Sequence, residues 1–225
     1  MTRADLLAWL EANASAKERA KLARYGIVTP KAYGIPMAAL LGFAKKQPKD
    51  HALAAALWKS GGYEARLLAS MLDDPAQVTP KQMDAWAADF DNWGVCDTVC
   101  WHLFDLTPHA WAKARTWSTA KPEFVKRAAF ALMAGRVRHE KTTPDARFLE
   151  LLPLIEVGAR DDRNFVMKGV SWALRRIGGR SPALHATCIG LAGRLAKAPE
   201  ASCRWVGKDA LRFLGTRKPK PAKKR

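Results

Sequence analysis

The tetrapeptide Phe124-Val125-Lys126-Arg127 decides the fold, because close copies follow at Phe165-Val166-Met167-Lys168 and Trp205-Val206-Gly207-Lys208. The copies begin 41 and then 40 positions apart. Each has an aromatic residue at its first position, a cation at its fourth, and small or apolar residues after it. Tyr63-Glu64-Ala65-Arg66 fits the same scheme further upstream. A recurrence near 40 residues indicates a repeated structural unit.

Apolar residues recur at helical spacing around these copies, whereas the alternation typical of strands is nearly absent. Leu6, Leu7, Leu10 and Ala14 show the pattern near the N-terminus. Pro and Gly interrupt it at short intervals, which leaves room for helices of about 10–15 residues. We therefore predict an all-α chain of about a dozen helices. Two helices in each unit of about 40 residues are typical of HEAT-type α-solenoids, whose stacked helices curve around a concave face.

The cations at the fourth position are expected to form a row, because equivalent helices of a solenoid stack side by side. Along a concave groove, such a row suits a helical polyanion such as duplex DNA. In the alternative interpretation, an aromatic residue followed by a cation is an ordinary amphipathic helix start, and the cations are merely solvated. The residues of the predicted row are Arg66, Arg127, Lys168 and Lys208.

The charge of the chain also favours a polyanionic partner. Its 225 residues carry a formal net charge of +17. The last nine residues hold six basic groups and no acid, and removing them lowers the net charge to +11, so the excess is not confined to the end. We predict one solenoid domain over residues 1–215 and a disordered basic Pro/Lys tail over residues 216–225, which adds phosphate affinity or serves only solubility.

Several classes of protein and site are disfavoured by the sequence. No apolar run approaches the ~18 residues of a membrane span, and the N-terminus lacks the apolar stretch of a signal peptide, so we expect a soluble intracellular protein. Cys96, Cys100, Cys188 and Cys203 are too few for a disulfide framework, and their spacing makes a poor zinc site. We expect buried helical thiols, no metal and, without a Gly-rich phosphate loop, no nucleotide cofactor.

One unit departs from the repeat, because an acid, Asp97, stands next to the position of the cation. Trp93, Asp97 and Trp101 lie near one helical face, at i, i+4 and i+8. An acid in a row of cations is the opposite of what phosphate binding requires. It is either a carboxylate kept ionised for chemistry by nearby guanidinium groups and flanked by indole faces, or a pairing partner for Arg127 or Lys126 on the next helix.

Three segments of the sequence resemble the AlkD-type DNA alkylation repair proteins, the HEAT-like repeat alkylpurine DNA glycosylases. They are Trp86–Leu103 (WAADFDNWGVCDTVCWHL), Val125–Ala128 and Val170–Gly178. Residues 25–30 and 34–36 match as well, as do residues 57–58 ahead of residues 63–66. The resemblance therefore runs from about residue 20 to about residue 215.

The resemblance implies a monofunctional glycosylase that excises cationic N3- or N7-alkylated purines from duplex DNA, without a metal or organic cofactor. The family's catalytic carboxylate falls on Asp97, its two cleft tryptophans on Trp93 and Trp172, and the arginine between them on Arg127. It also favours a monomer that acts on the chromosome in a bacterial cytoplasm. The phosphate contacts predicted for this function are Arg127, Arg66, Lys168, Arg175 and Lys208.

These residue types suit that chemistry. An alkylated purine leaves as a neutral base, so no strong general acid is needed, and Asp97 can stabilise an oxocarbenium-like sugar and orient water. The family's Trp-Trp-Asp pattern before the catalytic acid is here Asn92-Trp93-Gly94. Gly94 costs about 1 kcal/mol of helix propensity relative to Ala, which indicates a close backbone approach. The competing hypothesis is a non-catalytic HEAT scaffold that binds DNA or another acidic partner, in which Asp97 is only a salt-bridge partner.

Overall fold

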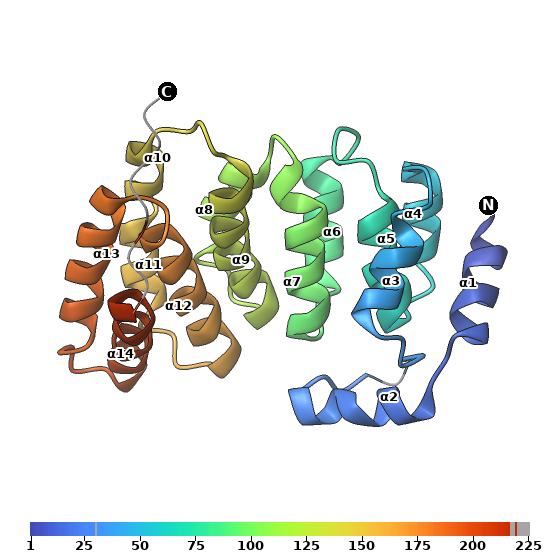
Figure 1. The fold of residues 1–225 in the computed structure, drawn as a ribbon, viewed down its shortest axis with the longest axis horizontal. Coiled ribbons are helices and arrows are strands. Elements are labelled where there is room, and N and C mark those ends of the chain that lie inside the picture. The colour runs from blue at the N-terminus through green and yellow to red at the C-terminus, as the bar shows by residue number, and fades with distance from the viewer. Residues whose placement is uncertain (30, 217–218, 220–225) are drawn as a thin grey trace. The chain divides into compact units, whose positions relative to one another are not determined.

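The computed structural model of the protein describes residues 1–29, 31–216 and 219. Over these residues the backbone forms fourteen α-helices, two short 3-10 helices and no strand, so the all-α prediction is confirmed. The chain divides into two compact units, unit 1 (Met1–His109) and unit 2 (Ala110–Arg225), both made of short helices joined by tight loops (Figure 1). None of the described helices is long and apolar enough to cross a membrane.

Unit 1 is organised around helix α5, in which every residue except Arg66 is buried. Helices α3, α4 and α7 pack against it. Polar caps fix where several helices begin: Thr2 forms a capping box on α1, Asp50 caps α4, and Thr79 caps α6 ahead of Pro80. The elements are α1 (Arg3–Ala12), α2 (Ala16–Leu22), η1 (Ala23–Tyr25), α3 (Met37–Ala44), α4 (His51–Trp58), α5 (Tyr63–Leu72), α6 (Pro80–Ala88), α7 (Trp93–His102) and η2 (Phe104–Leu106).

Unit 2 contains the longest helices, α9, α12 and α14, and α12 packs against both of the others. Helix α9 can approach its neighbours closely because the buried residues along it include several alanines, among them Ala128, Ala131 and Ala134. The shorter helices α8 and α13 pack against α9 and α14, respectively. The elements are α8 (Ala110–Trp117), α9 (Glu123–His139), α10 (Asp145–Leu149), α11 (Leu152–Gly158), α12 (Asn164–Gly178), α13 (Pro182–Leu195) and α14 (Ala201–Thr216).

The sequence repeat marks real helix starts in four of the five places where it occurs. Tyr63 and Trp93 are the first residues of α5 and α7, and Phe124 and Phe165 are the second residues of α9 and α12. The rings of Phe124 and Phe165 lie 5.4 Å apart, so repeat positions of neighbouring helices do meet within unit 2. Trp205 is different, because α14 begins four residues before it. The repeat copy at Trp205 therefore lies in the second turn of α14 and not at its start.

The cysteines are all buried and free, on α7, α13 and α14, which confirms the prediction of buried helical thiols. Burial raises the pKa of the Cys188 thiol to about 12. Most tryptophans outside the candidate site pack in the core, as the stacked pair Trp58 and Trp86 does at 4.0 Å. Trp205 is an exception, because it is 40% exposed.

The single domain predicted over residues 1–215 stays a prediction. The basic tail predicted over residues 216–225 lies largely outside the described residues, which end at Thr216 apart from Pro219.

Candidate functional site

The first turn of α7 fixes the indole of Trp93. Asn92 precedes the helix, and its side-chain oxygen accepts a hydrogen bond from the Val95 amide at 2.9 Å, which satisfies one of the unpaired amides of the helix start. Trp93 is the first helical residue, and its Nε1 donates to the Tyr25 carbonyl at 2.7 Å. The half-buried indole is thereby tied to the segment that follows α2.

The Tyr63 side chain leaves no room for a Cβ atom at position 94, which accounts for the glycine there. A Cβ atom at position 94 would lie 2.5 Å from the Tyr63 hydroxyl oxygen and 3.0 Å from the Cδ1 atom of Ile27. The sequence predicted a close backbone approach at Gly94, whereas the atoms that approach it in unit 1 belong to the side chains of Tyr63 and Ile27. Tyr63 is 8% exposed, and burial, aided by the charges of Glu64 and Asp91, raises its pKa to about 12. The phenol stays protonated at every physiological pH.

These side chains line a pocket of about 390 Å³ within unit 1. Asp97 and Thr98 face it from the second turn of α7, and Trp93 and Gly94 from the first. Most of its wall is aromatic or aliphatic. The remaining lining residues are Glu18, Lys21, Leu22, Tyr25, Ile27, Gly34, Ile35, Pro36, Met37, Tyr63 and Leu67.

The charged groups of the pocket are few. Glu18 and Lys21 form an ion pair, with Oε1 and Nζ 2.6 Å apart, so their charges offset each other. Asp97, which is partly buried, is the other charged residue that lines it. The pocket therefore combines aromatic surface with a carboxylate, which is an environment suited to a flat, positively charged ring.

One wall of the pocket is held in place by a buried acid. The carboxylate of Glu64, which is fully buried, accepts hydrogen bonds from the amides of Tyr33 (2.8 Å), Gly34 (2.7 Å) and Ile35 (3.2 Å). Gly34 has φ of +80°, and a Cβ atom there would lie 2.3 Å from the Ser15 carbonyl oxygen. Glycine at this position lets the start of α2 rest directly on the loop.

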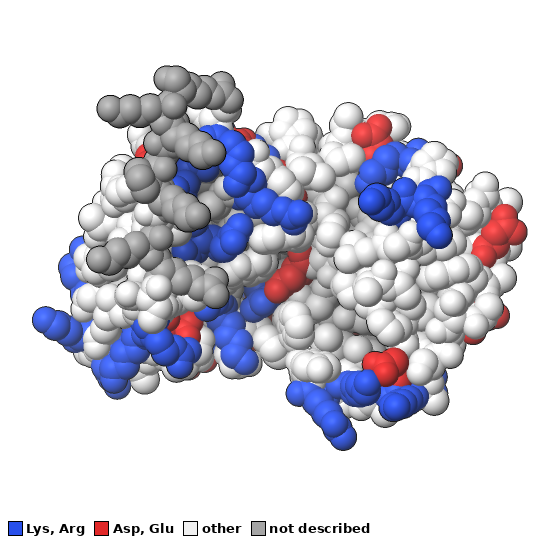
Figure 2. All heavy atoms as spheres, in the orientation of Figure 1, with Lys and Arg blue, Asp and Glu red and all other residues white. Residues whose placement is uncertain are grey.

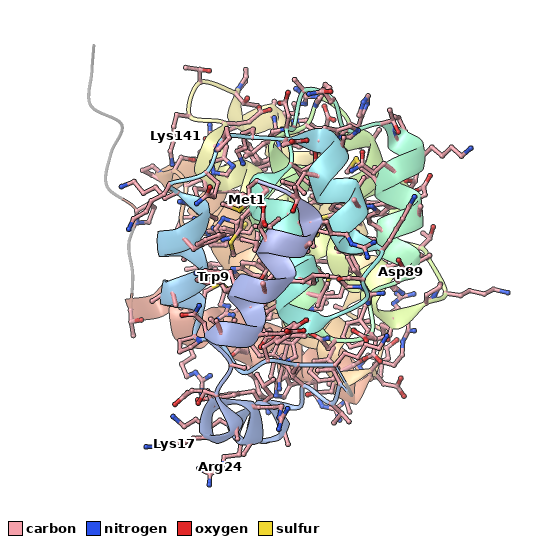
Figure 3. The ribbon with its side chains drawn as sticks, turned by 90° about the vertical axis from the view of Figure 1, so that its right-hand side faces the viewer. Met1, Trp9, Lys17, Arg24, Asp89 and Lys141 are labelled. Atoms are coloured by element: carbon pink, nitrogen blue, oxygen red, sulfur yellow. The ribbon has the colours of Figure 1, made fainter. Side chains whose placement is uncertain are left out.

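Helix α2 and the η1 turn form the outer cover of this pocket. Neither element has a buried residue. Lys17 and Arg24 extend from this segment away from the body of unit 1 (Figure 3). The cover is thus positively charged on its outside, while its inner side supplies Leu22 and Tyr25 to the pocket.

Arg66, the first cation of the predicted row, is bound inside unit 1. Its Nη1 donates to the Asp89 carbonyl at 3.0 Å, its guanidinium lies within 4.0 Å of the carboxylates of Asp89 and Asp91, and it sits 5.2 Å from the Trp58 ring. Its side chain is 16% exposed. A phosphate contact at Arg66 would have to compete with these partners.

Unit 2 carries the other predicted residues on three neighbouring helices. Arg127 on α9 is 6% exposed, and its Nη1 donates to the Phe165 carbonyl at 2.6 Å. Lys168 on α12 and Lys208 on α14 are exposed. Trp172 is partly buried on α12, one turn from Lys168. The exposed cations are thus available to an external anion, whereas Arg127 is largely enclosed.

Arg175 borders a basic hollow of about 600 Å³ in unit 2. Its Nε lies 3.6 Å from the Asp209 carboxylate, and its guanidinium is 5.1 Å from the Phe213 ring. Figure 2 shows Lys and Arg atoms in several patches on the visible face of this unit. The charged residues that line the hollow are Lys141, Asp145, Arg175, Arg176 and Arg180.

Comparison with known proteins shows the family of the chain. The sequence profile of the DNA alkylation repair enzyme family matches residues 6–214. The chain belongs to this family. Comparison with curated proteins gives no significant match.

A solved structure similar to this DNA alkylation repair family member comes from a new family of proteins related to the HEAT-like repeat DNA glycosylases, with affinity for branched DNA structures. The TM-score is 0.77 at 17% sequence identity, over 97% of this chain and 98% of that chain. At this identity the similarity concerns the fold, and it confirms the predicted HEAT-like repeats.

In this family member the predicted site residues fall into both units. Asp97 and Trp93 line one pocket of unit 1, and Trp172, Arg127, Lys168, Arg175 and Lys208 belong to unit 2. No group of three or more His, Cys, Asp or Glu side chains that could hold a metal ion occurs among the described residues.

Sequence reasoning missed Tyr25, Tyr63 and Glu64 as parts of the site. Tyr63 and Glu64 were assigned only to the helical repeat. The available signal was Glu64 itself, an acid in a helix whose other residues are apolar or small apart from Arg66, because a buried acid needs hydrogen-bond donors.

Proposed function

We propose that the protein is a monofunctional DNA glycosylase that hydrolyses the N-glycosidic bond of cationic N3- or N7-alkylated purines in duplex DNA. The observation that carries the proposal is the Asp97 carboxylate in an aromatic-lined pocket, in a chain of the DNA alkylation repair enzyme family. A groove that only bound phosphate would gain nothing from an acid at this place.

The proposed reaction follows from the charge of the substrate. When the bond between C1′ and the purine breaks, its electrons leave with the base and cancel the positive charge of the ring. The sugar becomes oxocarbenium-like, and Asp97 stabilises it electrostatically. A water oriented by the same carboxylate forms the new bond to C1′ and gives up a proton to solvent. The one lysine of the pocket, Lys21, is paired with Glu18, which favours water as the nucleophile.

The residues of unit 2 are assigned to DNA binding in this proposal. Lys168 and Lys208 are exposed cations on neighbouring helices, and Arg175 borders a basic hollow. Trp172 offers an indole face to the lesion or its sugar, and Arg127 supports a flanking phosphate. The enzyme acts as a monomer and works where the chromosome lies, which in a bacterium is the cytoplasm.

A second function deserves a direct test, because the solved relative has affinity for branched DNA structures. In that case the protein recognises DNA shape through its cations and performs no catalysis. Asp97 then serves as a salt-bridge partner, and its replacement changes stability and not turnover.

The deciding experiment measures release of free 7-methylguanine and 3-methyladenine from methylated duplex DNA. Wild type is compared with Asp97→Asn, and with Asp162→Asn, which removes the same charge from an exposed position. We expect release by wild type and by Asp162→Asn, and a loss of about 100-fold or more in Asp97→Asn, with DNA binding retained. Salt-dependent binding without release by any of the three proteins would establish the DNA-binding function instead.

A further inference from the structure

The basic hollow of unit 2 holds more positive charge than its own acid balances. Among the described residues that line it, four are cations and one, Asp145, is an acid. The last turns of α9 and α12 border the hollow through Val137 and Arg176. Each helix C-terminus contributes about half a negative charge, so a surplus of about two positive charges remains. The four cations are Lys141, Arg175, Arg176 and Arg180.

The acid of the hollow is engaged in holding the loop between α9 and α10. Asp145 accepts a hydrogen bond from Arg180 Nε at 3.1 Å and another from the Ser181 hydroxyl. Arg180 Nη2 also donates to the Thr143 carbonyl at 2.6 Å, and its guanidinium lies 4.4 Å from the Phe148 ring. These contacts fix the loop against the start of α13. The Asp145 carboxylate therefore balances Arg180 and not the other cations of the hollow.

A second acid, Asp209 of α14, is shared in the same way. Its carboxylate accepts hydrogen bonds from the Ser171 hydroxyl and from Arg212 Nη2, both at 2.6 Å, and lies 3.6 Å from Arg175 Nε. Two guanidinium groups thus share one carboxylate, which leaves net positive charge beside the hollow. Arg175 is also held in place before any ligand arrives, so binding needs little further ordering of its side chain.

Arg176 lies in surroundings that disfavour its charge. Burial, and then the positive charge of Arg138, lower the pKa of its guanidinium below the ordinary value of 12.5. The group nevertheless stays protonated at neutral pH, as arginine does in proteins. An anion in the hollow would offset the repulsion between these two cations, so the site gains electrostatic free energy when it is filled.

We propose that this hollow binds a dianionic phosphate group, either the phosphomonoester at the end of a nucleic-acid strand or free inorganic phosphate. A phosphomonoester carries about 1.5 to 2 negative charges at pH 7, which matches the surplus of the hollow, whereas each phosphodiester of a continuous backbone carries one. Arginine side chains bind phosphate oxygens in pairs, which adds geometric selectivity.

The proposed phosphate site is separate from the pocket of Asp97, because its residues belong to unit 2 and those of the pocket to unit 1. It does not depend on base release. It goes beyond the contacts with a duplex backbone proposed for Lys168, Lys208 and Arg175, because it selects a phosphate by its charge state.

The first test titrates the full chain with methyl phosphate and with dimethyl phosphate, and follows the amide NMR signals of the protein. We expect methyl phosphate, the dianion, to bind about tenfold more tightly than dimethyl phosphate, the monoanion. Its affinity should fall between pH 7.5 and pH 5.5, because the monoester takes up a proton near pH 6. Equal affinity for the two compounds would overturn the proposal.

Charge-removing variants place the phosphate in the hollow. Lys141 is exposed, so Lys141→Gln should fold as wild type does, and it should weaken methyl phosphate binding by about tenfold. Arg176→Gln should have at least the same effect, with a thermal melt to verify its fold. Lys197→Gln removes the same charge from an exposed position of unit 2 outside the hollow and should bind as wild type. Equal weakening in Lys141→Gln and Lys197→Gln would overturn the assignment to the hollow.

The last experiment identifies the source of the phosphate. Single-stranded oligonucleotides labelled at the 3′ end, with either a 5′-phosphate or a 5′-hydroxyl, are compared by fluorescence anisotropy. A gain of about tenfold from the 5′-phosphate, absent in Lys141→Gln, would identify a strand end as the ligand. Equal binding of the two oligonucleotides, together with inorganic phosphate binding that Lys141→Gln removes, would identify free phosphate. If neither dependence on Lys141 occurs, the hollow is not a phosphate site.

Discussion

At the scale of single residues, Gly94 and Tyr63 form a pair in which each constrains the other. Replacing Gly94 by Ala places a Cβ atom 2.5 Å from the phenol oxygen and 3.0 Å from Ile27, and the buried phenol must shift. We expect Gly94→Ala to lower the free energy of unfolding by about 1 kcal/mol, because the overpacking outweighs the better helix propensity of Ala. Equilibrium urea denaturation measures this.

The double variant Gly94→Ala with Tyr63→Phe tests whether the phenol oxygen is the cause. It removes the atom closest to the new methyl group, so most of the lost stability should return. If the double variant loses as much free energy of unfolding as the two single variants together, the contact between the phenol oxygen and the new methyl group is not the cause.

The residue scale is also where sequence reasoning was least complete. Asp97 and Trp93 could be singled out because they are four apart on one helix and break a visible repeat. Tyr25 and Tyr63 could not, because they meet α7 only through contacts across more than 30 positions. Glu64 signals a need for hydrogen-bond donors, but the sequence does not reveal that the loop at 33–35 supplies them. Nothing in local spacing records which side chain faces Gly94.

At the scale of elements, the aromatic residues of the repeat are good markers of helix starts, because they lie at the first or second residue of α5, α7, α9 and α12. Trp205 failed as a marker, since α14 begins earlier, at Ala201. The segment Ala201–Arg204 has no aromatic residue of its own, so the aromatic pattern does not reveal this additional helical turn.

One ion-pair cluster joins two elements of unit 2 and carries a pH prediction. The Asp161 carboxylate lies 2.6 Å from Arg163 Nη2 and 2.9 Å from Lys126 Nζ of α9. Hydrogen bonds from Arg163 and then Lys126 hold the pKa of Asp161 well below its ordinary value of 3.8. The folded protein therefore keeps this carboxylate ionised where the unfolded chain would bind a proton, so its stabilising contribution is complete above about pH 4 and is lost as the pH falls further.

Asp161→Asn should lower the free energy of unfolding at pH 7 by about 1–2 kcal/mol. It should also make stability fall less steeply between about pH 4 and about pH 2 than in wild type. Denaturation curves at a series of pH values measure both effects. The exposed neighbour Asp162 gives the control variant Asp162→Asn, and an equal effect of the two substitutions would refute the assignment to the cluster.

At the scale of the whole molecule, the net charge of +17 predicts affinity for DNA that weakens with salt. The exposure of the individual cationic side chains decides which of them to replace in a test. Arg66 and Arg127 are bound to groups of their own units, whereas Lys168 and Lys208 are exposed. The two lysines are therefore the informative pair, although all four cations share one sequence pattern.

Replacing Lys168 and Lys208 together by Ala should reduce the slope of log affinity against log salt concentration by about 2, since each phosphate contact contributes about 0.9. Fluorescence anisotropy with an undamaged duplex at several salt concentrations measures the slope. Lys59→Ala with Lys197→Ala removes the same charge from other exposed positions, and an identical change in this control would show that only net charge matters.

The cover formed by α2 and η1 differs from the rest of unit 1 in how easily it unfolds locally. None of the residues 16–25 is buried. This segment therefore contributes little to cooperative unfolding, and it can open locally at a small fraction of the free energy of global unfolding. Asp97 stands on α7, whose residues are mostly buried. Under the proposed function, access to the pocket and the chemistry of Asp97 would thus depend on segments of different stability, so the cover could change in evolution to admit other adducts while the helix that carries Asp97 is retained.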